Sequence, residues 1–180
     1  MKFSLVALLI ASLLSACSDK VAESGKTAPS AASSSAGAFI PVTGTRPASI
    51  PSALKGTDNC AVDLINAAVA TESTAIADKT QVSLTGWAAD SVTGTVPKEV
   101  FLEIDGPAKA YIQAATGISR PDVASHFNKP ALGTAGWSAA ANLGSLPSGT
   151  YVLRVIQLSG SSVGALCDPH RVIVLNSAGG

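Results

Sequence analysis

The sequence predicts an all-β fold, an antiparallel β-sandwich with one short helix, and three observations support this prediction. Several segments alternate apolar and polar residues, as half-buried strands do, and glycine and proline residues separate these segments. One segment breaks the alternation and carries the residues that begin a helix. The chain has 180 residues, and the patterned part, residues 58–176, is long enough for one domain.

The strand pattern recurs along this predicted domain. Residues 80–88 alternate polar and apolar side chains. Residues 99–105 do the same and lead through an Asp-Gly turn into residues 109–114, which predicts a β-hairpin. Residues 149–158 and 171–175 are rich in β-branched side chains and are predicted as two further strands. The alternation assigns these side chains to the core, with Trp87 as a further candidate: Val82, Leu84, Val100, Leu102 and Ile104.

One segment, residues 119–127, does not follow the strand pattern. Pro121 and Asp122 are residue types that the first turn of a helix accepts, because proline lacks only an N–H that would be unpaired there. Val123 and Phe127 are four residues apart, so both would lie on the face that packs against the sheet. We therefore expect a short helix near residues 120–127, with Arg120 and Asp122 close enough to brace it by an ion pair or by backbone hydrogen bonds.

Tyr151 follows a turn rich in glycine and proline and stands at the start of a predicted strand. This position is typical of a tyrosine corner, in which the phenol hydrogen-bonds back to the preceding loop of a β-sandwich. We expect the Tyr151 hydroxyl to make such a bond.

The N-terminus has the pattern of an export signal. Lys2 precedes an apolar stretch, residues 6–14, that is too short to remain in a membrane as a helix. The stretch ends in Leu14-Ser15-Ala16-Cys17, which resembles the lipobox of bacterial lipoproteins. The resemblance implies that residues 1–16 are a signal peptide and that Cys17 receives a diacylglyceryl group and a further acyl chain of the palmitate type. The alternative is an ordinary secretory peptide that leaves Cys17 as a free thiol.

The lipobox resemblance also implies a location. Two or three acyl chains anchor a protein far more firmly than one. In lipoproteins of the enteric type, absence of Asp after the lipidated cysteine directs the protein to the outer membrane, and Ser18 occupies that position here. We therefore expect a protein of the cell envelope, anchored by lipid in the outer membrane.

Residues 17–57 are predicted to form a flexible tether, and residues 177–180 a disordered tail. Alanine, serine, threonine, glycine and proline dominate the tether, and such a composition buries too little apolar area to offset the entropy of ordering. Phe39, Ile40, Ile50 and Leu54 interrupt this composition. They leave open whether the second half of the tether docks on the domain.

Cys60 and Cys167 lie near the two ends of the predicted domain. With Cys17 assigned to lipid, these two are expected to form a disulfide in an exported protein. Closing a loop of this size stabilises a fold by about 4.7 kcal/mol in the chain-entropy model. The alternative is a zinc site with His126 and His170, but the Cys-x-x-Cys spacing of such sites does not occur, and we expect no metal or cofactor.

A second resemblance rests on an ordered set of motifs. The set resembles an immunoglobulin-like β-sandwich module of bacterial envelope proteins, which occurs alone or attached to membrane enzymes that handle surface polysaccharide. It covers about two thirds of the chain and implies an immunoglobulin-like fold, but no catalytic residue. The motifs are Cys60-Ala61-Val62-Asp63-Leu64-Ile65-Asn66, Gly86-Trp87-Ala88-Ala89-Asp90, Arg120-Pro121-Asp122-Val123-Ala124, Ala135-Gly136-Trp137 and Gly149-Thr150-Tyr151.

Several function classes fit the sequence poorly. The 12 basic and 12 acidic residues give no net charge, whereas nucleic-acid binding favours an excess of Lys and Arg. Residues 160–164 match the pattern Gly-x-Ser-x-Gly, but they lie between two predicted strands, whereas a nucleophile motif of this kind needs a strand followed by a helix. Glu103 and Asp105 are expected to point from one strand into water rather than across a cleft, as glycoside hydrolysis would need. We therefore expect a protein that is not an enzyme and does not bind nucleic acid.

The expected function is binding, most simply of another envelope protein. The alternative is a glycan-binding module for peptidoglycan or surface polysaccharide, with aromatic rings as stacking platforms for sugars. The exposure of Trp87 and Trp137 would separate these two readings, because sugar stacking needs exposed rings whereas buried rings belong to the core. The candidate binding residues are Trp87, Asp90, Tyr111, Arg120, Asp122 and Trp137.

Overall fold

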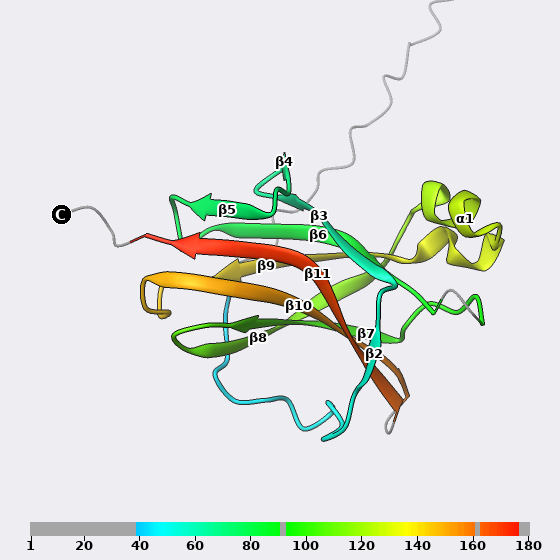
Figure 1. The fold of residues 1–180 in the computed structure, drawn as a ribbon, viewed down its shortest axis with the longest axis horizontal. Helices are drawn as coiled ribbons and strands as arrows, with labels where there is room; N and C mark the ends of the chain where they lie inside the picture. The colour runs from blue at the N-terminus through cyan, green and yellow to red at the C-terminus, as the bar shows by residue number, and fades with distance from the viewer. Residues whose placement is uncertain (1–38, 91–92, 161–162, 177–180) are drawn as a thin grey trace, which may run out of the picture. The chain divides into compact units, whose positions relative to one another are not determined.

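The computed structural model describes residues 39–90, 93–160 and 163–176 (Figure 1). The predicted signal peptide, Cys17 and the first part of the predicted tether lie outside the described residues, as does the predicted tail at 177–180. Within the described ranges, no helix has both the length and the apolar composition needed to cross a bilayer.

The all-β prediction is confirmed, because strands make up most of the described chain and α1 (Pro121–Phe127) is its only α-helix. A short 3-10 helix, η1 (Pro130–Thr134), follows it. The strands are β1 (Ile40–Pro41), β2 (Lys55–Thr57), β3 (Cys60–Ile65), β4 (Ala68–Val69), β5 (Ser73–Ile76), β6 (Val82–Ala88), β7 (Glu99–Asp105), β8 (Lys109–Ile118), β9 (Gly136–Asn142), β10 (Gly149–Gly160) and β11 (Val163–Leu175).

The strands form one curled sheet in the order β2-β11-β10-β7-β8-β9-β6-β3-β4, with β1 paired to β9 and β5 paired to β11. Strand β8 joins the two halves of this sheet. Its residues 109–114 pair with β7, and its residues 115–118 pair with β9. We call β11-β10-β7 the first half and β9-β6-β3 the second half.

The sheet is mixed, whereas the sequence predicted purely antiparallel pairing. Strand β1 pairs in parallel with β9, and β2 and β5 both pair in parallel with β11. Strand β2 follows β1, and β5 follows β3 and β4, all of which pair within the second half. Both β2 and β5 then cross to the first half, where they run in the same direction as β11. An alternating pattern of side chains carries no information about strand direction, which is why the sequence did not indicate this.

The core lies between the two halves of the sheet. It joins side chains of β3, β6 and β9 to side chains of β7, β8, β10 and β11. The predicted core residues are all buried, with exposed fractions of at most 1%, so their assignment from the alternation is confirmed: Val82, Leu84, Val100, Leu102 and Ile104.

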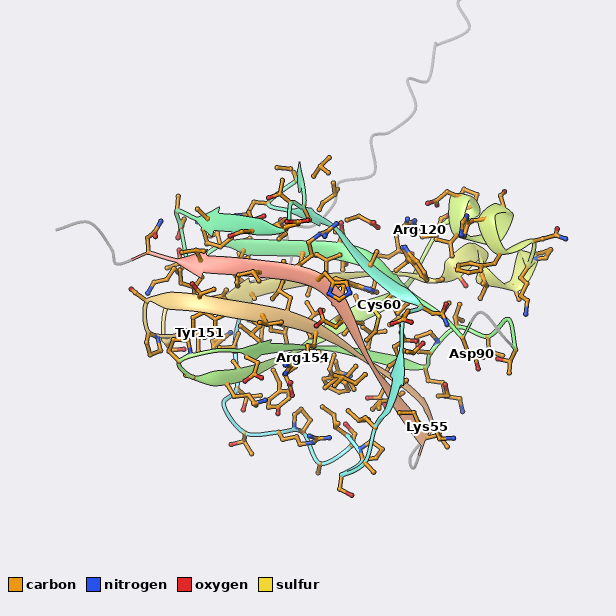
Figure 2. All side chains as sticks on the ribbon, viewed as in Figure 1. Lys55, Cys60, Asp90, Arg120, Tyr151 and Arg154 are labelled. Atoms are coloured by element: carbon orange, nitrogen blue, oxygen red, sulfur yellow. A yellow bond between two sulfur atoms is a disulfide. The ribbon has the colours of Figure 1, made fainter. Side chains whose placement is uncertain are left out.

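The predicted disulfide between Cys60 and Cys167 is present. Cys60 begins β3 and Cys167 lies inside β11, and these strands stand near opposite ends of the strand order. The bond therefore joins two strands that lie near opposite ends of the curled sheet, and Cys60 is labelled in Figure 2. Because both sulfur atoms are used in this bond, they are not zinc ligands.

Residues 39–57, which we call the strap, are ordered against the sheet, so the structure differs from the predicted boundary at residue 58. Thr43 exchanges two backbone hydrogen bonds with Tyr111, of 2.9 and 3.3 Å. Ile50 is 5% exposed and, with Leu54, covers apolar side chains on the outer face of the first half: Phe101, Tyr111, Ile156 and Leu158. Two well-placed apolar residues thus order a segment whose composition predicts a flexible tether.

Tyr151 forms the expected tyrosine corner. Its side chain is fully buried, and its hydroxyl donates a hydrogen bond of 2.9 Å to the carbonyl oxygen of Pro147. Burial raises the pKa of this phenol. Gly106 passes close to the ring, because a Cβ at this position would lie 2.7 Å from Cδ1 of Tyr151.

Candidate functional site

Helices α1 and η1 lie between β8 and β9 and project from one end of the sheet (Figure 1). The predicted helix near 120–127 is thereby confirmed. It begins at Pro121, as expected for a residue without an N–H, and ends at Phe127, where Asn128, with a left-handed φ of 52°, caps it. A small apolar cluster fixes both helices to the sheet, and its buried members are Ala89, Val123, Leu132 and Ala135.

An ionic contact holds α1 to the second half of the sheet (Figure 2). Arg120 precedes the helix and donates from Nε and Nη2 to the two carboxylate oxygens of Asp122, at 2.9 and 2.7 Å. Its Nη1 donates at 2.5 Å to Asp63 on β3. We call these three residues the Arg120 clamp. The sequence predicted the contact between Arg120 and Asp122, whereas the contact with Asp63 arises only in the fold.

The Arg120 clamp stabilises the charged forms of its members. The hydrogen bonds from Arg120 lower the pKa of Asp122 to about 2. The pKa of Arg120 is raised, first by the hydrogen bond to Asp122. Asp122 is therefore ionised at neutral pH, and with all three groups charged the clamp carries a formal charge of −1.

The lowered pKa of Asp122 predicts an acid-dependent contribution to stability. Because the folded-state pKa lies below the ordinary value of 3.8, this contribution is present above pH 4 and is lost as the pH falls toward 2. The Asp122 side chain is 63% exposed, so solvent screening keeps the effect below about 1 kcal/mol. We expect Asp122→Asn to be less stable than the wild type at pH 6 in urea denaturation, and nearly equal to it at pH 2. An equal difference at both pH values would contradict this assignment.

Three aromatic rings gather on the side of α1 that faces β6. The Trp87 ring lies 5.7 Å from the Phe127 ring, centre to centre, at an interplanar angle of 64°. The His126 ring lies 4.8 Å from Phe127 at 85°. Together with Asp122 and Val123 these rings line a hollow of about 330 Å³. We call it the aromatic pocket.

Two other hollows adjoin the helical segment. One, of about 430 Å³, lies between α1 and η1 and includes Ser125 in its lining. The other, of about 400 Å³, is lined by residues of β3, β6, β8 and β9 and by Arg120. Trp137 forms part of its wall but is only 1% exposed, and its indole Nε1 has no hydrogen-bond partner among the described residues. The surface around α1 is therefore hollowed on several sides.

The structure brings together only part of the predicted set of binding residues. Trp87, Arg120 and Asp122 meet at α1, and Trp137 packs into the core behind them. Tyr111 lies elsewhere, 4% exposed beneath the strap.

Tyr111 and Asp90 each have local contacts that explain their positions. Burial raises the pKa of Tyr111, and a hydrogen bond with Glu103 raises it further. Asp90 accepts a hydrogen bond of 3.0 Å from the backbone N–H of Thr93 and pairs with Thr95, so it closes a turn.

His126 and Phe127 belong to the aromatic pocket, but sequence reasoning did not group them with Trp87. It considered Phe127 only as a helix residue that packs on the sheet, and His126 only as a zinc ligand. The contact between Phe127 and Trp87 joins residues forty positions apart. No local pattern in the sequence indicates such a contact.

A second charged cluster lies on the outer face of the first half. Arg154 on β10 donates to Glu103 at 3.0 Å and to Asp105 at 2.6 Å, and Lys109 lies 3.3 and 3.1 Å from the same two carboxylates. The expectation that both acids face water is wrong for Glu103, which is 6% exposed. Cations on both neighbouring strands and the ring of Tyr111 cover it.

The charges of this cluster balance one another. Burial opposes the ionisation of Asp105, but its hydrogen bonds with Lys109 and Arg154 and their charges lower its pKa overall. Each carboxylate already has two cationic partners. The cluster is therefore best understood as a contact that joins three strands.

Metal geometry and similarity to known proteins give no further assignment. Within residues 39–90, 93–160 and 163–176, no three His, Cys, Asp or Glu side chains are grouped to hold a metal ion. In comparisons with known proteins, no family model, curated protein or solved structure matches this chain significantly.

Proposed function

We propose that this chain is a lipid-anchored protein of the bacterial cell envelope, and that its β-domain is a non-catalytic module that binds another envelope protein through the surface around α1. The anchor rests on the lipobox resemblance at Leu14-Ser15-Ala16-Cys17, and the outer membrane on Ser18. The disulfide supports export, because such bonds persist in oxidising compartments.

We further propose that the domain is an immunoglobulin-like sandwich. Of its seven longer strands, the first, second and fifth (β3, β6 and β9) lie in one half, and the third, sixth and seventh (β7, β10 and β11) in the other. Immunoglobulin domains divide their strands between two sheets in this way. In them the fourth strand pairs with the fifth, as the end of β8 pairs with β9 here. The tyrosine corner at the start of β10 is a second feature of that fold.

The observation that carries the binding proposal is the burial of the candidate aromatic rings. Trp137 and Tyr111 are 1% and 4% exposed, so neither ring face is available to a sugar. Trp87 is half-buried, and Phe127 packs against it. What remains open around α1 is a hollowed surface lined by small, proline and aromatic side chains together with Ser125, Asn128 and Asp122, a mixture that favours contact with a protein.

The test is crosslinking in cells followed by purification of the tagged protein. We expect one envelope protein to be recovered with the wild type and lost with Ser125→Arg, which places a bulky charge on the exposed side of α1. Gln113→Arg is the matched control, because Gln113 is also exposed but lies on β8, away from α1. Recovery of polysaccharide without a protein, or equal recovery with both variants, would overturn the proposal.

The anchor has its own test. We expect the wild type to sediment with membranes and to incorporate labelled palmitate, and Cys17→Ala to lose both properties. Loss of the thiol leaves no atom for the diacylglyceryl group, while the described part of the chain is unchanged. If Cys17→Ala stayed in the membrane fraction with normal processing, the lipid anchor would be disproved.

A further inference from the structure

We infer that the aromatic pocket binds a cationic side chain, the guanidinium or ammonium group of an Arg or Lys that the protein partner presents. This inference rests on the proposed function and specifies the chemistry of its contact. It depends on three features of the pocket: its ring faces, its charge and its apolar floor.

The ring faces provide the first part of the argument. Aromatic faces carry partial negative charge and attract cations within about 6 Å, and tryptophan does so most strongly. Trp87 and Phe127 meet at 64°, and His126 and Phe127 at 85°, so the faces that bound the hollow are not parallel. A flat sugar ring stacks on one open face, whereas a compact cation can lie against several inclined faces at once.

The charge at the wall provides the second part. Asp122 lines the pocket, and no Lys or Arg is among its lining residues. The Asp122 carboxylate accepts hydrogen bonds from Arg120 and from backbone N–H groups of Asp122 and Val123, and its side chain is still 63% exposed. The Arg120 clamp retains a formal charge of −1, so an incoming cation would neutralise it.

The floor and the size provide the third part. Val123 closes the bottom of the pocket and is 4% exposed, so it offers an apolar surface to the methylene stem of a long side chain. A hollow of about 330 Å³ accommodates the end of an Arg or Lys side chain. A neutral apolar side chain would also fit, but it would leave the negative charge of the Arg120 clamp uncompensated.

The test uses a matched pair of small probes on the full chain with Cys17 replaced by alanine. The probes are Nα-acetyl-arginine methylamide and the citrulline analogue, which has nearly the same shape without the charge. The chain has two tryptophans, Trp87 and Trp137, whose indole N–H signals in NMR spectra can be assigned with Trp87→Phe. We expect the arginine probe to shift the Trp87 signal saturably and to bind about tenfold more tightly than the citrulline probe.

Two variants and one control locate the effect. Asp122→Asn preserves the shape of the pocket and is expected to weaken binding of the arginine probe several-fold, and Trp87→Leu to abolish it. Glu99→Gln removes the same charge from β7, outside the pocket lining, and is expected to leave binding unchanged. An unchanged Trp137 signal shows that each variant is folded, because Trp137 lies in the core.

Three results would overturn the inference. These are equal binding of the two probes, equal binding by Asp122→Asn and the wild type, and a shift of Trp87 by an N-acetylglucosamine oligomer in place of the arginine probe. Its failure is distinguishable from failure of the proposed function. A partner lost only with Ser125→Arg would support the binding module even if no cation binds, whereas cation binding without a recovered protein would contradict the module but support the pocket.

Discussion

Replacing Cys60 and Cys167 together by alanine is expected to lower the free energy of unfolding by about 4.7 kcal/mol. The two residues are 107 positions apart, so the bond removes much of the freedom of the unfolded chain. They also lie in β3 and β11, which are otherwise far apart in the strand order. Urea denaturation of the double variant and the parent chain, both with Cys17 replaced by alanine, measures the loss.

Reduction of the parent chain provides the control for this prediction. Dithiothreitol breaks the same bond without removing the two sulfur atoms, both of which are buried. We expect the reduced chain and the double variant to lose similar amounts of stability, since loop closure dominates over packing. A loss below about 1 kcal/mol in both would show that contacts alone hold the ends of the sheet together.

Gly86→Ala is expected to destabilise the domain by about 3 kcal/mol, near the upper end for an overpacked core. A Cβ on Gly86 would lie 1.9 Å from the carbonyl oxygen of Ala61 and 2.5 Å from Cζ2 of Trp137. The first contact is with the backbone of β3. This strand cannot move away from the added methyl group without losing its backbone hydrogen bonds to β6. The second is with a buried ring in the core, so the variant must also displace Trp137.

The matched control for Gly86→Ala is Gly56→Ala. Gly56 is also in a strand, β2, but a Cβ there would meet no atom within 4 Å. We expect Gly56→Ala to change stability by less than about 0.5 kcal/mol. Urea denaturation followed by tryptophan fluorescence measures both variants and reports the surroundings of Trp137. Equal effects of the two substitutions would contradict the steric argument.

The sequence predicted strands well where large apolar residues alternate. Strands β6 and β7 have such alternation, and the core residues predicted in them are buried. It missed β9, because after Trp137 this strand consists of serine, alanine and asparagine, whose small side chains give little contrast between faces. It missed β4 and β5 because two to four residues are too few to show a period.

The strap shows a different limit of composition. Its serine, threonine, glycine and proline residues predict a flexible segment, and most of them are exposed in the structure. Ile50 is nevertheless buried, because it packs against an apolar surface on the outer face of β7 and β10, formed by Phe101, Ile156 and Leu158. The order of this segment depends on a surface built by residues more than forty positions later.

The candidate site was predictable where its contacts are local. Arg120 and Asp122 are two positions apart at the start of a recognisable helix, so their contact followed from the sequence. The contacts of Arg120 with Asp63 and of Phe127 with Trp87 depend on how α1 lies on the sheet. Composition also could not distinguish Trp87 from Trp137, because burial decides between them and depends on register.

The position of the disulfide determines how the domain responds to a pull from its N-terminal side. The strap ends just before Cys60, and from Cys60 to Cys167 the covalent chain is a closed ring. Tension first draws out residues 39–59, which reach about 70 Å at about 3.4 Å per residue. Beyond them, force divides between β3 and, through the sulfur bridge, β11. The residues of the α1 surface lie between Cys60 and Cys167 in the sequence. The strap can therefore extend under tension while that surface keeps its conformation.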